Sequence, residues 1–118
     1  MEQVLEIIIV DDEEIVHTTI GDYLRDVGHH VEGARNGIDA LEKIMTHEYD
    51  LALADIRMPR MDGLKLLEEI QKIRPELSVI LITAHGTMET VVQALRLGAV
   101  DFLTGNPSLE AVRRRPVR

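Results

Sequence analysis

The stretch Ile7-Ile8-Ile9-Val10-Asp11-Asp12 decides the fold, because four consecutive apolar residues run directly into two carboxylates. A short apolar run without alternation is typical of a strand buried on both faces, as in a parallel sheet covered by helices. Two more such runs cover residues 51–54 and 79–82, and weaker strand candidates cover residues 30–34 and 100–104. We therefore expect five strands.

Between these runs the apolar residues recur with a helical period. The expected helices cover residues 14–27, 38–45, 64–73, 87–97 and a short stretch after Ser108 that Pro116 ends. Asp62 is the predicted N-cap of the third helix. The apolar stripes of the first two helices are predicted to include Ile15 and Met45. Strands and helices thus alternate along the whole chain.

This alternation predicts an α/β domain with a doubly wound, five-stranded parallel sheet between two helical layers. The flavodoxin-like strand order 2-1-3-4-5 is the leading arrangement. The 118 residues fit one domain, so we expect a single domain over 1–118 with no room for a second one. Residues 105–118 are atypical, because a tail of net charge +3 follows a body of net charge −11.

The composition excludes several classes of function. The formal net charge of −8 argues against nonspecific binding of nucleic acid or of an anionic membrane. The absence of cysteine excludes disulfides and thiolate metal sites. The chain has no apolar run of membrane-spanning length and no signal-peptide pattern at its start. We therefore expect a cytoplasmic protein that contacts neither membrane nor nucleic acid directly.

Polar side chains follow three of the predicted strands where each strand ends. Asp11 and Asp12 follow the first strand, Asp55 the third and Thr83 the fourth. Parallel strands present their carboxyl ends on one edge of the sheet, so these groups are expected to converge. Carboxylates about 4 Å apart repel by roughly 4 kcal/mol, and a bound Mg2+ would offset this. The alternative is that Asp11 or Asp12 simply caps the first helix.

The sequence resembles the receiver domain of bacterial two-component response regulators. The resemblance rests on residues 8–13 (IIVDDE), 54–63 (ADIRMPRMDG), 82–86 (ITAHG) and 98–104 (GAVDFLT), in consistent order. It implies that Asp55 is the phosphoacceptor, taking a phosphoryl group from a sensor histidine kinase, a phosphotransfer protein or a small phosphodonor. Such a domain phosphorylates itself and is not a turnover enzyme.

The resemblance also implies a ligand set and a switch. Asp12 would bind Mg2+ directly with the help of Asp11, and Asp55 and the backbone carbonyl of Arg57 would complete the protein ligands. Thr83 would turn its hydroxyl toward the phosphoryl group. Homodimers would form through the face built by the fourth helix, the fifth strand and the fifth helix.

Phe102 matches the switch aromatic of receiver domains, whose rotamer is coupled to the threonine of the preceding strand. A single aromatic residue on the last strand is equally well explained as part of the core. Both interpretations of Phe102 therefore remain open.

One position departs from the receiver pattern. Gly105 stands where receivers carry a lysine that pairs with the phosphoryl group. Three explanations are possible. The chain is a degenerate receiver that acts as a phosphorylation-independent interaction module, or a receiver in which phosphorylation is only weakly coupled to Thr83 and Phe102, or its tail is altered or artificial. The degenerate receiver is the alternative function. Whether the domain belongs to a DNA-binding regulator or to a hybrid kinase stays open.

Other classes fit the residues less well. A haloacid-dehalogenase-type phosphohydrolase needs a second aspartate two residues after its nucleophile, where Asp55 is followed by Ile56 and Arg57. A nucleotide or flavin binder needs a glycine-rich or hydroxyl-rich loop after the first strand, which the sequence lacks. The five histidines show no metal-ligand spacing, and His17 is expected to face solvent.

Overall fold

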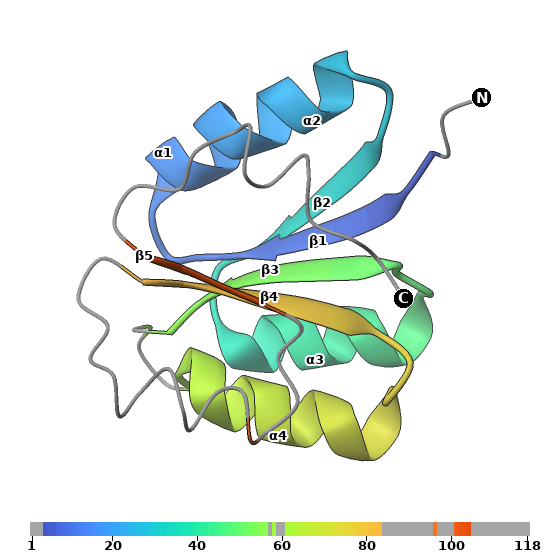
Figure 1. The fold of residues 1–118 in the computed structure, drawn as a ribbon, viewed down its shortest axis with the longest axis vertical. Helices are drawn as coiled ribbons and strands as arrows, with labels where there is room; N and C mark the ends of the chain where they lie inside the picture. The colour runs from blue at the N-terminus through green and yellow to red at the C-terminus, as the bar shows by residue number, and fades with distance from the viewer. Residues whose placement is uncertain (1–3, 57, 59–60, 84–95, 97–100, 105–118) are drawn as a thin grey trace.

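The computed structural model describes residues 4–56, 58, 61–83, 96 and 101–104 of the chain. Five parallel strands form one sheet in the order β2-β1-β3-β4-β5 (Figure 1). Their bounds are β1 Glu6–Val10, β2 His30–Ala34, β3 Leu51–Asp55, β4 Ser78–Thr83 and β5 Asp101–Thr104. The predicted five-stranded parallel sheet and its flavodoxin-like order are confirmed.

Helices cover both faces of this sheet. One continuous helical segment comprises α1 (Glu14–Val16), a π-helical stretch η1 (His17–Gly21) and α2 (Asp22–Asp26). It lies on one face, and α3 (Gly37–Thr46) and α4 (Gly63–Ile73) lie on the other (Figure 1). Within the described ranges, no helix has the length and apolar composition that crossing a membrane would need. The helices expected over 87–97 and after Ser108 lie outside the described residues.

The unalternated apolar strands pack into two separate core layers, one on each face of the sheet. In β1, Ile8 and Val10 face the layer beneath α3 and α4, whereas Ile7 and Ile9 face the helical segment of residues 14–26. Successive strand residues point to opposite faces, so an unbroken apolar run fills both layers at once. Burial on both faces is the physical reason for the pattern on which the sequence prediction depended.

Two side chains fix the starts of α3 and α4. The Asp62 carboxylate accepts the Lys65 N–H at 2.9 Å, which confirms Asp62 as the N-cap of α4. The Asn36 side-chain oxygen accepts the Asp39 N–H at 2.8 Å in the same way. Each bond satisfies one backbone donor that the first helical turn leaves unpaired, and this sets where each helix begins.

Two predicted stripe residues point away from the core. Ile15 is 63% exposed and Met45 is 62% exposed, so both predictions of burial are wrong. The inward stripe of the first helix has a spacing of four and runs through Val16, Ile20 and Leu24. Ile15 lies five residues before Ile20, which takes it off that face.

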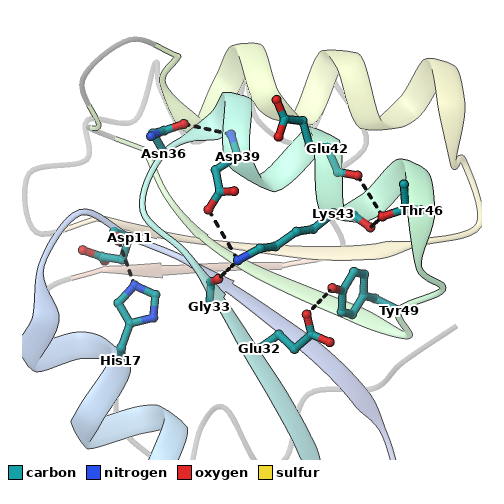
Figure 2. Close-up of polar contacts among 10 residues, drawn as sticks. All are labelled: Asp11, His17, Glu32, Gly33, Asn36, Asp39, Glu42, Lys43, Thr46 and Tyr49. Atoms are coloured by element: carbon teal, nitrogen blue, oxygen red, sulfur yellow. Dashed lines mark hydrogen bonds and ion pairs between the residues drawn. The ribbon is translucent and has the colours of Figure 1, made fainter.

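Strand β2 lies at one edge of the sheet and receives bonds from two cationic side chains. The Arg25 guanidinium donates to the Val31 carbonyl oxygen at 2.9 Å. The Lys43 ammonium donates to the Gly33 carbonyl oxygen at 2.5 Å, as Figure 2 shows. Helices on opposite faces of the sheet thus both reach the outer rim of β2.

Candidate functional site

Three carboxylates meet at the carboxyl ends of the two central strands. Asp11 and Asp12 follow β1, and Asp55 is the last residue of β3. Because β1 and β3 are neighbours in register, with Val10 opposite Ala54, their ends lie side by side. One carboxylate oxygen from each aspartate lies within 4.8 Å of the other two. The predicted convergence of these three residues, hereafter the acidic cluster, is therefore observed.

The three side chains of the acidic cluster differ in solvent exposure. Asp11 is 4% exposed, Asp55 is partly buried and Asp12 is exposed. Burial raises the pKa of the Asp11 carboxyl, and the neighbouring Asp12 carboxylate raises it further, although a hydrogen bond from the Glu13 N–H opposes the shift. The negative charge of Asp11 is thus costly in the metal-free protein.

Helix capping does not account for these aspartates. The N-cap of α1 is Glu13, whose side chain makes no capping bond. Asp11 Oδ1 instead accepts the Glu13 N–H at 2.8 Å, which fixes one side of its carboxylate. The alternative interpretation, in which Asp11 or Asp12 caps the first helix, is therefore wrong.

A glycine makes room for the backbone that carries Asp55. The Gly63 N–H donates to the Ile56 carbonyl oxygen at 2.8 Å, which brings the start of α4 against the end of β3. A Cβ atom on Gly63 would lie 2.4 Å from the Asp55 carbonyl oxygen and 2.8 Å from the Ile56 Cα. In the sequence, Gly63 merely stands between the predicted N-cap Asp62 and the helix expected over residues 64–73, because the sequence does not show which backbone comes close to it.

A histidine expected in solvent contacts the acidic cluster. His17 is partly buried, and its Nε2 lies 2.8 Å from the Asp11 carbonyl oxygen. A carbonyl oxygen can only accept, so Nε2 carries the proton and donates. The prediction that His17 faces solvent is wrong, and its distance of six residues from Asp11 gave no sequence motif.

The remaining predicted site residues are only partly described. Thr83 is the last residue of β4, and in the pairing of β4 with β5 it lies opposite Thr104. Phe102 lies in β5 opposite Leu81. The backbone of Thr83 therefore ends on the same edge of the sheet as Asp55. Arg57, Gly105 and residues 84–95, which follow Thr83, lie outside the described residues.

The acidic cluster fits a hard divalent cation. Carboxylate oxygens are the ligands that Mg2+ prefers, and Mg2+ usually binds one or two of them while keeping several waters. One of the three carboxylates is exposed, which leaves the cluster open toward solvent. A buried, partly uncompensated Asp11 charge is the kind of electrostatic cost that a cation relieves.

Comparison with known proteins identifies the same fold and family. The chain is 43% identical over 99 residues to the transcriptional regulatory protein ZraR of Klebsiella oxytoca, covering 84% of this chain and 22% of that protein. A CheY-like receiver domain protein from Methanospirillum hungatei superposes with a TM-score of 0.90 at 31% identity, covering 94% of this chain and 89% of the other. The beryllofluoride-activated NtrC4 receiver domain dimer gives a TM-score of 0.84 at 32% identity, covering 89% and 87% of the two chains.

These matches concern one domain of longer proteins. The chain spans only about a fifth of the length of the ZraR proteins it resembles, 22% in each. The model of the response regulator receiver domain family matches residues 7–114. With the fold, the strand order and the acidic cluster in place, the chain belongs to the response regulator receiver domain family.

Proposed function

We propose that this chain is a phosphoacceptor domain in which Asp55 takes a phosphoryl group from a histidine kinase or a small phosphodonor. The observation that supports this best is the acidic cluster, with one oxygen each from Asp11, Asp12 and Asp55 within 4.8 Å. An Asp55 carboxylate oxygen forms a bond to phosphorus while the bond from phosphorus to the donor nitrogen or oxygen breaks. The donor keeps that electron pair and takes up a proton where its chemistry requires one.

The acidic cluster would also hold the cation on which this transfer depends. Asp12 and Asp55 would ligate Mg2+, and Asp11 would do so directly or through its waters. When bound, Mg2+ offsets the repulsion between the Asp55 carboxylate and the incoming phosphoryl oxygens. The Asp11 carboxylate is oriented for this role by the Glu13 N–H.

Three further roles rest on the family pattern. The carbonyl of Arg57 would be another Mg2+ ligand, the Thr83 hydroxyl would contact the phosphoryl group, and Phe102 would change rotamer with it. The backbone of Thr83 ends on the same sheet edge as Asp55, which supports its assignment. These are phosphorylation-dependent changes within one domain, so we do not expect turnover of a substrate.

Phosphorylation is expected to depend on one carboxylate. After incubation with acetyl phosphate and MgCl2, intact mass spectrometry should detect one added phosphoryl group on the wild type and none on Asp55→Asn. Asp50→Asn is the matched control. Asp50 directly precedes β3 whereas Asp55 ends it, and the Asp50 carboxylate accepts the Glu6 N–H at the opposite end of the strand from the acidic cluster. A wild type that stays unmodified, or an Asp55→Asn protein that still gains the group, would contradict the proposal.

The missing lysine is expected to weaken switching rather than phosphorylation. Gly105 stands where receivers carry a lysine that pairs with the phosphoryl group. A phosphoryl group on Asp55 would therefore lack one cationic partner. Gly105→Lys should enlarge the chemical-shift changes of the Thr83 and Phe102 amides on phosphorylation, measured by NMR. Equal changes in the two proteins would show that the lysine is not what limits the response.

The proposed setting is a two-component system. A sensor histidine kinase or phosphotransfer protein would supply the phosphoryl group, and the chain would act within a longer regulator of transcription like the relatives it matches. The NtrC4 receiver domain forms a dimer in its beryllofluoride-activated state, which supports a homodimer here. The face expected to form it, around β5 and its flanking helices, lies largely outside the described residues.

A further inference from the structure

Three hydrogen bonds hold Asp11, the residue that follows β1. The Asp11 N–H donates to the Ala34 carbonyl oxygen of β2 at 3.0 Å, and Asp11 Oδ1 accepts the Glu13 N–H at 2.8 Å. The third bond comes from the His17 ring, whose Nε2 donates to the Asp11 carbonyl oxygen at 2.8 Å (Figure 2). Among these bonds, only that of His17 comes from a side chain of the neighbouring helical segment.

The ring of His17 fits because β2 carries a glycine beside it. A Cβ atom on Gly33 would lie 2.7 Å from His17 Nδ1, closer than Cβ contacts are observed, and a tight 3.0 Å from Cε1. The Gly33 carbonyl is held in turn by Lys43 at 2.5 Å, as Figure 2 shows. His17 is also the first residue of the π-helical stretch, a feature often found at functional sites. The ring therefore fills a space that other residues leave open for it.

We infer that His17 is a positioning residue for the acidic cluster. The Asp11 carbonyl and the Asp12 N–H belong to one planar peptide, so fixing that carbonyl also fixes the direction in which Asp12 leaves the strand. Asp12 is the exposed member of the acidic cluster, and this peptide joins it to the buried Asp11. The inference deepens the proposed function, since it rests on the acidic cluster binding Mg2+.

Removing the ring is expected to weaken Mg2+ binding by about tenfold, the usual scale for a residue that orients a metal ligand. Mg2+ titrations followed by calorimetry would compare the wild type with His17→Ala and His17→Gln. The glutamine amide places a donor near the position of Nε2, so it should restore most of the affinity. Thr18→Ala is the matched control, because Thr18 is an exposed neighbour on the same helical segment and should leave Mg2+ affinity unchanged.

A double-mutant cycle separates positioning from general loss of structure. Gly33→Ala places a methyl group against the ring and should weaken Mg2+ binding to a similar extent. The double variant of His17→Ala and Gly33→Ala should bind no more weakly than His17→Ala alone, because no ring remains to be displaced. Urea unfolding of each metal-free variant reports on folding. Amide hydrogen exchange at Asp12 reports on the peptide between Asp11 and Asp12 without Mg2+.

The outcomes are distinguishable. A wild type that binds no Mg2+ would contradict the proposed function and this role together. A wild type that binds Mg2+ while His17→Ala binds equally well would contradict only the role of His17. Full additivity in the cycle, or a His17→Gln variant as weak as His17→Ala, would also overturn the inference.

Discussion

Replacing Asp11 with asparagine is expected to weaken Mg2+ binding by at least about tenfold while stabilising the metal-free protein. The asparagine keeps an Oδ1 that can accept the Glu13 N–H at the position where Asp11 now accepts it, 2.8 Å away. The variant therefore loses a charge and retains the hydrogen bond. The stabilisation should be on the order of 1–3 kcal/mol, because a buried carboxylate near two others is replaced by a neutral group.

The gain should depend on pH in a definite direction. The pKa of Asp11 is raised in the folded protein, chiefly by burial, so the unfolded chain ionises first as the pH rises. Stability is unaffected at pH values below the ordinary pKa, falls as the pH rises to the raised pKa, and stays lower above it. Asp11→Asn removes this contribution, so its advantage over the wild type should be present at neutral pH and should vanish in acid.

Urea titrations with and without MgCl2 measure both effects. At neutral pH the metal-free variant should be the more stable protein, and added Mg2+ should stabilise the wild type more than the variant. Asp50→Asn is the control, because Asp50 also accepts a backbone N–H, that of Glu6 at 2.8 Å, at the other end of β3. If Asp11→Asn lowered the stability of the metal-free protein, the electrostatic account of the acidic cluster would be wrong.

Replacing Gly63 with alanine is expected to destabilise the protein by about 2–4 kcal/mol and to slow phosphorylation of Asp55. The added Cβ would lie 2.4 Å from the Asp55 carbonyl oxygen and 2.8 Å from the Ile56 Cα. Both are backbone atoms, so no side chain can rotate away, and α4 and the end of β3 must separate. That movement shifts the residue that is proposed to accept the phosphoryl group.

Gly28→Ala is the matched control for this variant. Gly28 has φ +106°, which strains any other residue, yet a Cβ there would meet no atom within 4 Å. It should cost about 1–2 kcal/mol of stability while leaving the rate of phosphorylation unchanged. Unfolding curves and phosphorylation time courses with acetyl phosphate would be recorded for both variants. Equal phosphorylation rates would show that the contact at Gly63 does not position Asp55.

The sheet and the acidic cluster could be predicted because both follow from patterns that one sequence displays. Unbroken apolar runs mark strands buried on both faces, and parallel strands bring Asp11 and Asp55 to one edge whatever their separation in the chain. The outward direction of Ile15 could also have been found, since a spacing of four through Val16, Ile20 and Leu24 excludes it.

The contacts that shape the site could not be predicted in this way. The bond from His17 to Asp11 needs the exact path of the helical segment and a glycine at position 33 of a different strand. The clearance at Gly63 is a distance of a few ångströms between two backbones. Periodicity reports which face a residue occupies, whereas these contacts depend on how closely two elements approach.

The two cations on the rim of β2 have a consequence for the behaviour of the sheet as a surface. A strand at the edge of a sheet exposes backbone groups that can recruit a strand from another molecule, which is a route to aggregation. Here the carbonyl oxygens of Val31 and Gly33 already accept bonds from Arg25 and Lys43. An incoming strand would have to displace both cations from these carbonyl oxygens, so this edge is protected against intermolecular strand addition.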